Sequence, residues 1–159
     1  MAAGGLLCAA VGLSALLAAT GTEFWLRGRG DNVGLWRICT AGGRCGTDPG
    51  PPAMWDATRA LMLLAVLAAA LGFAAGLSAA GAARRARERV AGISLVLAGL
   101  LALLGLAVCT VGVRGSAWRF SWSYILGWVG VVLIGSAGLF HLCAAAKDAS
   151  PESSESGGG

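Results

Sequence analysis

Four long runs of uncharged, mostly apolar residues constrain this chain more than any other feature of its sequence. They cover residues 2–22, 60–83, 90–113 and 120–146. Each run meets the requirement of roughly 20 apolar residues for a helix that crosses a hydrocarbon layer about 30 Å thick. The crossing segments must be helical, because lipid offers no partner for exposed backbone N–H and C=O groups. The runs therefore predict four membrane-spanning helices, with both chain ends on the same side.

Composition favours a membrane protein and argues against two other classes. Of the 159 residues, 57% are hydrophobic and 13% are charged, and the mean hydropathy is +0.74. A soluble domain of this size would leave much of that apolar surface in water. The net charge of +4 comes with arginines scattered through the polar segments, and no basic stripe is interleaved with aromatic residues as in nucleic-acid-binding proteins. We expect contact with the lipid bilayer and no nucleic-acid partner.

The boundaries of the spans follow from the charged residues that flank them. We expect helices at about residues 3–24, 56–81, 89–113 and 121–146. The remaining segments are outer loops at about 25–55 and 114–120, an inner loop at about 82–88 and a disordered inner tail at 147–159. No Lys or Arg precedes the first run, so we expect a retained helix rather than a cleaved signal peptide. Asp56 is a candidate N-cap of the second helix.

The first outer segment carries the main polar motif of the chain. Residues 35–39 alternate in character and suit a short strand. Cys39 and Cys45 are the only cysteines in the outer segments, because the other three fall within spans: Cys8, Cys109 and Cys143. We expect a Cys39–Cys45 disulfide, worth about 2–2.5 kcal/mol on the chain-entropy model. The alternative is a metal site, which lacks a second cysteine pair and a nearby histidine.

The disulfide, rather than the loop charge, determines the orientation that we predict. Seven basic residues fall on the side of the cysteine motif and five on the other side, so a simple positive-inside count points the wrong way. The density of basic residues is nevertheless highest in residues 84–89. Disulfides form in the secretory lumen or outside the cell. We therefore expect the Cys39–Cys45 loop outside and both chain termini in the cytosol.

The sequence contains no recognisable catalytic constellation. The single histidine, His141, lies in the inner half of the fourth run, and none of the runs contains Asp, Glu, Lys or Arg as an acidic or basic partner for it. Proton relays and most ion paths use ionisable groups inside the membrane, so we do not expect a self-contained transporter. Phosphate-binding glycine loops and Ser/His/Asp sets are also absent. We expect neither an enzyme nor a cofactor, a metal ion or a small-molecule substrate.

Several short features indicate modification or packing sites. Trp36 fits a tryptophan C-mannosylation pattern, and Cys143 is a candidate for palmitoylation, with an inert apolar thiol as the alternative. Gly72 and Gly76 form a small-xxx-small step, which we expect to pack inside the bundle rather than at a dimer face. Residues 29–31 read Arg-Gly-Asp, an integrin-type tripeptide short enough to arise by chance.

The outer motif resembles the signature of the claudin, peripheral myelin protein and epithelial membrane protein superfamily. The residues that carry this resemblance are Trp25, Gly34, Leu35, Trp36, Cys39, Cys45 and Arg59. Residues 55–60 and 118–128 are similar to the lens-fibre members of the superfamily. The chain departs from the claudins in its shorter first outer segment, which weakens a barrier-forming role.

The resemblance implies an all-α membrane protein. Its fold would be a left-handed bundle of four transmembrane helices with a small extracellular antiparallel β-sheet built from the two outer loops. Trp25 and Leu35–Trp36 would anchor the sheet at the bilayer rim, and the disulfide would tie neighbouring strands. Glu23 and Arg59 would pair at the outer ends of the first two helices, with snorkelling of Arg59 as the alternative.

The resemblance also implies a function without catalysis. We expect a structural protein of cell–cell contacts or junctions at the plasma membrane, whose outer sheet meets a second copy or another protein, laterally or on a facing membrane. Two alternatives remain from the sequence. One is an accessory subunit that modulates a channel, and the other is a vesicle or granule membrane protein that affects trafficking or exocytosis. Fold alone does not decide among them.

Overall fold

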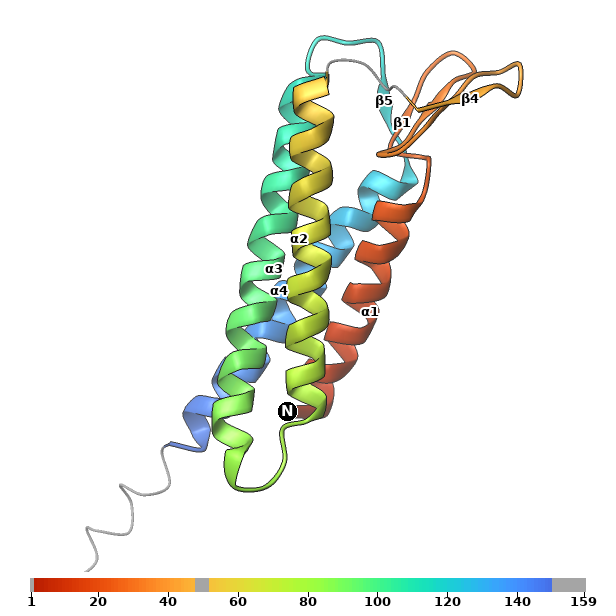
Figure 1. Cartoon of the computed structure of the whole chain (residues 1–159). Helices are drawn as coiled ribbons and strands as arrows, with labels where there is room; N and C mark the ends of the chain where they lie inside the picture. The colour runs from red at the N-terminus through yellow and green to blue at the C-terminus, as the bar shows by residue number, and fades with distance from the viewer. Residues whose placement is uncertain (1, 48–51, 150–159) are drawn as a thin grey trace, which may run out of the picture.

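Four long helices form an elongated bundle that carries a small sheet at one end (Figure 1). The structure is a computed structural model that describes residues 2–47 and 52–149. Its helices are α1 (Ala2–Gly21), α2 (Pro52–Leu77), α3 (Arg84–Val113) and α4 (Trp122–Lys147). All four are long and apolar enough to cross a membrane, as the sequence predicted. Both the N-terminal end and the end of α4 lie away from the sheet (Figure 1).

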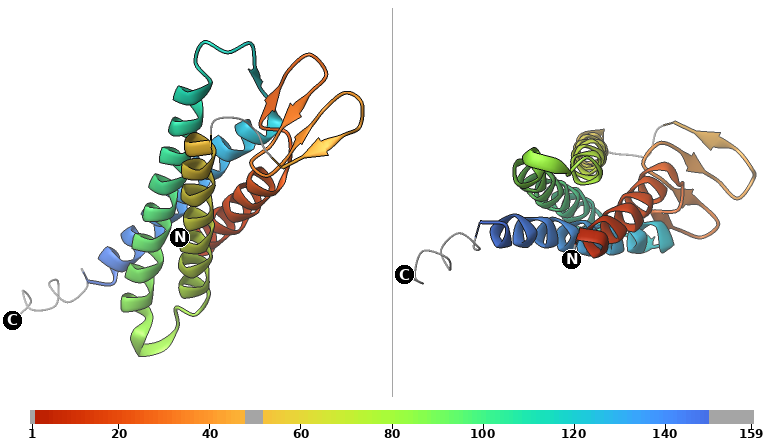
Figure 2. Two further views of the ribbon diagram at one scale, coloured as in Figure 1. Left: turned by 45° about the horizontal axis from the view of Figure 1, so that its top comes forward. Right: turned by 90° about the horizontal axis from the view of Figure 1, so that it is seen from below.

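Neighbouring helices pack through glycines and other small residues. Helix α2 runs beside α3, and α4 contacts both α1 and α3 (Figure 2). Gly12 of α1 lies so close to Ile134 of α4 that a Cβ at this position would come within 2.9 Å of its side chain. Gly130 of α4 faces Leu16 of α1 in the same way. Close approach of this kind gives membrane helices their van der Waals contacts, while large apolar side chains remain on the lipid-facing surface.

Two helices begin earlier than the sequence indicated. Helix α2 starts at Pro52, because proline is tolerated in a first turn whose N–H groups have no helical partner. Asp56 therefore lies inside the helix, and its predicted role as an N-cap is wrong. Helix α3 starts at Arg84, after a short 3₁₀ turn η1 (Gly81–Ala83), so the basic residues 84–89 are helical. The prediction of a disordered tail over residues 147–159 is wrong at Lys147, which is the last residue of α4, and the part of the tail from residue 150 onward lies outside the described residues.

The sheet contains five strands of two residues each in the antiparallel order β4-β3-β2-β1-β5. The strands are β1 (Leu26–Arg27), β2 (Asn32–Val33), β3 (Ile38–Cys39), β4 (Cys45–Gly46) and β5 (Arg119–Phe120). Strand β5 comes from the second outer loop and pairs with β1 from the first. The sheet built from two outer loops is thus confirmed. The strand predicted over residues 35–39 is wrong in its first half, because only Ile38 and Cys39 belong to a strand.

Candidate functional site

The outer end of α1 is capped by side chains that follow it in the sequence. The last four carbonyls of a helix have no partner within the helix, and an unpaired carbonyl near the bilayer is costly. Three of these carbonyls accept side-chain hydrogen bonds: Ala18 from Thr22 Oγ1 (2.7 Å), Ala19 from Trp25 Nε1 (2.5 Å) and Thr20 from Trp36 Nε1 (2.9 Å). Both motif tryptophans therefore act as caps of α1.

The Gly-Leu-Trp segment forms the tight turn that brings Trp36 to α1. The turn is closed by a hydrogen bond from the Gly34 N–H to the Arg37 carbonyl at 2.9 Å. Gly34 lies against the backbone that directly follows α1, because a Cβ at this position would come within 2.5 Å of Glu23 Cα. Leu35 is fully buried beneath the turn. The three residues thus supply clearance, an apolar anchor and an indole N–H donor, in that order.

Arg59 of α2 attaches to the same turn. Its Nε donates to the Leu35 carbonyl at 2.5 Å, and its guanidinium carbon lies 5.6 Å from the centre of the Trp36 ring. Its Nη1 forms an ion pair with Asp56 at 3.0 Å. Arginine suits this position because its planar group can donate, stack and pair at once. Arg59 therefore links α2 to the hairpin turn, and its expected pairing with Glu23 is not observed.

A disulfide joins Cys39 of β3 to Cys45 of β4, which lie directly opposite each other in the strand register. Glu23 lies beside it, with Oε2 at 3.2 Å from Cys39 Sγ and Oε1 at 3.8 Å from Arg37 Nη1. A disulfide sulfur has no proton to donate, so the contact with Oε2 is not a hydrogen bond. A metal site at this position would require reduced cysteines, because only thiolates can act as ligands. The Glu23 carboxylate and the two sulfur atoms offer ligand atoms that lie within 4.8 Å of one another.

Trp25 also connects the sheet to α4. Its backbone carbonyl accepts a hydrogen bond from the Ser121 N–H at 2.9 Å, and its ring meets Tyr124 edge-on at 6.3 Å between centres. Close by, the Thr22 and Ser123 hydroxyls lie 2.5 Å apart. These contacts join α1, the sheet and the start of α4 in one buried cluster. The sheet is therefore held at fixed positions on the bundle.

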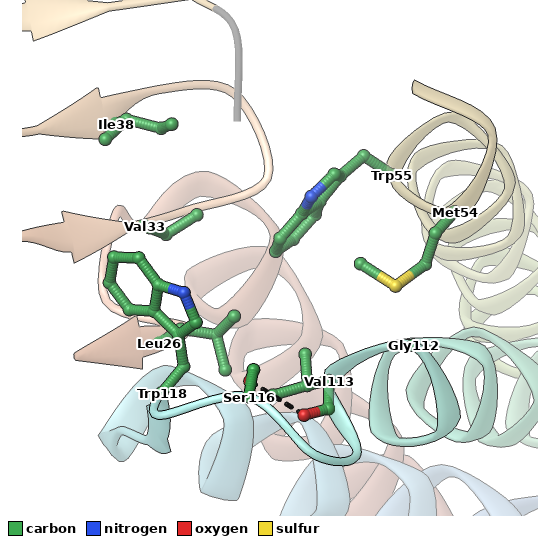
Figure 3. A pocket seen from close by; sticks show the side chains of 9 residues that line it. All are labelled: Leu26, Val33, Ile38, Met54, Trp55, Gly112, Val113, Ser116 and Trp118. Atoms are coloured by element: carbon green, nitrogen blue, oxygen red, sulfur yellow. Dashed lines mark hydrogen bonds between the residues drawn. The ribbon is translucent and has the colours of Figure 1, made fainter. Parts of the chain in front are cut away.

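An apolar cavity of about 220 Å³ lies between the inner face of the sheet and the outer ends of α2 and α3 (Figure 3). The side chains that define it are Leu26, Val33 and Ile38 from three strands, Met54 and Trp55 from α2, and Trp118. Ser116 also lines it, and its hydroxyl donates to the Val113 carbonyl at 2.7 Å. The lining offers apolar contact and brings no acid, base or nucleophile pair together. It provides no chemistry beyond packing.

The remaining predicted site residues lie apart from this cluster. Trp36 is 42% exposed, and Cys143 is exposed on α4, so C-mannosylation and palmitoylation stay predictions. Gly72 lies against Leu95 of α3, and Gly76 lies against Leu6 of α1 and against α4. Residues 29–31 form the β1–β2 turn, in which the Asp31 carboxylate accepts a hydrogen bond from a backbone N–H at 3.2 Å.

One buried polar pair was not predicted from the sequence. His141 Nδ1 lies 2.5 Å from Glu88 Oε2, and the two side chains are only 1% and 2% exposed. The expectation that His141 has no acidic partner in any span is wrong, because α3 begins early enough to include Glu88. Helical spacing was the signal that could have revealed it, since Glu88 shares a buried face with Ala91, Gly92 and Leu95.

Comparisons with known proteins agree with the fold. A family model described as PMP-22/EMP/MP20/Claudin family matches residues 1–141. The Lens fiber membrane intrinsic proteins of Rattus norvegicus and Homo sapiens are 41% and 40% identical to this chain over 155 residues, which cover 89% of each chain. Claudin domain-containing protein 2 of Mus musculus is 34% identical over 131 residues, covering 79% of this chain and 75% of the relative.

Proposed function

This chain belongs to the PMP-22/EMP/MP20/claudin family, and from that premise we propose that it is a non-enzymatic structural protein of cell–cell contacts. Its outer sheet would present the contact surface, either to a lateral neighbour or to a protein on a facing membrane. The observation that carries the proposal is the way the sheet is fixed. Two indole caps, Arg59 and the pairing of β5 hold it on the bundle while outward residues such as Arg27 and Arg119 remain exposed.

A rigid surface suits recognition because little conformational entropy is lost when a partner binds. The outward row of the sheet contains Arg27, Asn32 and Cys39, whereas the inward row of Leu26, Val33 and Ile38 faces the helices. This outward row is polar, with Arg27 exposed and Asn32 and Cys39 half-buried, and it does not offer a large apolar patch. We infer a contact surface that relies on charge and shape rather than on hydrophobic burial.

We also propose that the sheet lies outside the cell and that both chain ends are cytosolic. The support is chemical, because a disulfide persists in the oxidising lumen and outside the cell but is rare in the cytosol. Both ends of the described chain lie at the opposite end of the bundle from Cys39 and Cys45, which is compatible with this topology.

The test is to remove the disulfide and follow the protein in cells. The double substitution Cys39→Ser with Cys45→Ser should lower stability by about 2–2.5 kcal/mol and cause retention in the secretory pathway or loss of enrichment at contacts. Cys8→Ala, a cysteine substitution within α1, is the matched control and should traffic normally. Normal trafficking and contact enrichment of the double variant would exclude the disulfide-held sheet as the contact element.

The same cells distinguish the two other functions. Localisation of the endogenous protein on internal granules instead of contacts would favour a role in trafficking or exocytosis. Cross-linking in native tissue followed by mass spectrometry should return a contact protein or a second copy. Recovery of a channel as the main cross-linked partner would favour the accessory-subunit function and replace the proposal above.

A further inference from the structure

Three arginines gather at one edge of the outer sheet. The strand register sets Arg27 of β1 directly opposite Arg119 of β5. Arg29, from the β1–β2 turn, lines the same surface hollow of about 360 Å³. All three side chains are exposed. We call these three residues the arginine cluster.

The arginine cluster is electrostatically unfavourable in the protein alone. Side chains directly opposite in an antiparallel pair have Cβ atoms about 5 Å apart, and like charges there are destabilising. Three other arginines of the chain form ion pairs: Arg37 with Glu23, Arg59 with Asp56 and Arg84 with Asp148. Within residues 2–47 and 52–149, no carboxylate forms an ion pair with a member of the cluster. The positive charges of the cluster are therefore available to bind an anion.

Contacts around β1 and β5 prevent Arg27 and Arg119 from moving apart to reduce their repulsion. Trp118 lies over Gly28, and a Cβ at Gly28 would come within 2.7 Å of its ring. The Gly28 N–H also closes the β1–β2 turn by donating to the Asp31 carbonyl at 2.8 Å. These contacts hold the segment of Arg119 against the segment of Arg27. An arrangement that is fixed and repulsive is typical of a site preorganised for an opposite charge.

The position of the arginine cluster relative to the bilayer indicates which anion it meets. Strand β5 leads directly into α4, whose first residue, Trp122, is exposed and packs against Phe24 with 5.5 Å between ring centres. Exposed aromatic residues at the end of a span mark the bilayer interface. Arg119 is three residues before Trp122, which is at most about 10 Å of extended chain. The headgroup layer is about 5 to 7 Å deep on each side, so the cluster lies at or just above the lipid phosphates.

We propose that the arginine cluster binds the phosphate of a phospholipid headgroup in the leaflet on the sheet side of the chain's own bilayer. Arginine matches phosphate because its fork of N–H donors can engage two oxygens at once. The occupied site would offset the Arg27–Arg119 repulsion and fix the β1/β5 edge against the membrane. The opposite edge, at β4, would then remain for protein partners. The inference does not rest on the proposed role at cell contacts.

A lipid-binding assay on the full-length protein in detergent micelles tests the proposal. The probe is a short-chain phospholipid, and the readout is its affinity together with the rise in unfolding temperature that it causes. Arg27→Gln and Arg119→Gln should each weaken binding about tenfold or more, as expected for loss of a hydrogen bond to a charged group. Arg44→Gln is the matched control, because Arg44 is an exposed arginine of the same outer segment beside β4. This control should bind like the wild type.

A second readout distinguishes lost binding from lost folding. Without lipid, Arg27→Gln and Arg119→Gln should unfold at the same temperature as the wild type or higher, because each removes a like-charge repulsion. Equal loss of affinity in Arg44→Gln would show a general effect of surface charge and overturn the proposal. Tighter binding of inorganic phosphate or of a sulfated oligosaccharide than of the phospholipid would also overturn it, because the anion would then come from solution or from a glycan.

Discussion

Different kinds of contact hold the helices together at the outer and the inner end of the bundle. At the outer end, the sheet, the disulfide and several side-chain hydrogen bonds connect α1 and α2 to α4 through many independent contacts. At the inner end, one buried pair between Glu88 and His141 joins α3 to α4. The outer end is therefore redundant, whereas the inner end depends on one buried polar pair, beside which the partly exposed Arg84–Asp148 ion pair also joins α3 to the end of α4.

The inner pair affects more than the two helices that contribute it. The His141 ring also lies against Gly5 of α1 and Gly76 of α2, where an added Cβ would approach it to 3.2 Å and 3.0 Å. Its Nε2 is buried and makes no hydrogen bond within the part of the chain that the structure describes. All four helices thus meet around one imidazole. The contrast suggests that damage at the inner end spreads to every helix, while damage at the outer end is shared among contacts.

The largest expected effect comes from the most connected residue of the outer end. Trp25→Ala removes a fully buried indole and leaves the Ala19 carbonyl without its donor. We expect a loss of about 4–6 kcal/mol, because truncating a buried tryptophan costs about 3–5 and an unpaired buried acceptor adds about 1. Unfolding of the purified protein in mixed detergent micelles measures it. Trp25→Phe keeps a buried aromatic ring but removes the N–H donor to the Ala19 carbonyl. It therefore separates the packing loss from the hydrogen-bond loss and should retain most of the stability.

If damage at the outer end stays local, Trp25→Ala should leave the inner half of the bundle intact. Accessibility of introduced cysteines along α3 to a thiol reagent reports on this. Labelling that increases near Val113 but not near Glu88 would support independent ends. Labelling that increases uniformly would mean that the two ends unfold together.

The inner pair should show the second-largest effect. His141→Leu leaves the Glu88 carboxylate buried without a partner, which we expect to cost about 3–5 kcal/mol. Replacing both residues with leucine removes the buried charge as well, so the double variant should be markedly more stable than His141→Leu. The same unfolding assay measures the coupling. Additive losses from His141→Leu and Glu88→Leu would contradict a direct interaction between the two side chains.

The contrast between the ends also explains what the sequence could predict. Four spans were predictable because an apolar run of that length has one stable arrangement in lipid. The pairing of Cys39 with Cys45 was predictable because the outer segments contain no other cysteine. The family resemblance implies that Trp25 and Trp36 anchor the sheet at the bilayer rim. Their contacts with the end of α1 were not predictable, because a backbone carbonyl acceptor leaves no signal in the sequence.

The sequence-based expectations differ from the structure where a run of charged residues indicates a loop. Residues 84–88 contain three arginines and one glutamate, and this density of charge predicts an inner loop. In the structure the segment is helical, and Glu88 lies on the buried face that continues through Leu95. Asp56 was misassigned for a related reason, because helix α2 begins upstream at a proline. Short strands were poorly predicted since a two-residue strand is defined by its partners rather than by its own pattern.

The smallest expected effect tests whether an individual contact at the outer end is dispensable. Trp36→Phe removes the N–H that caps Thr20 but keeps an aromatic ring beneath Arg59. Since Trp36 is partly exposed and water can replace the lost donor, we expect a loss of about 1 kcal/mol or less. Arg59→Lys is the complementary change, because it retains the charge but loses the planar group that stacks on Trp36. If either substitution alone costs as much as Trp25→Ala, the outer end is not redundant, and the Gly-Leu-Trp turn itself is the single point on which the sheet depends.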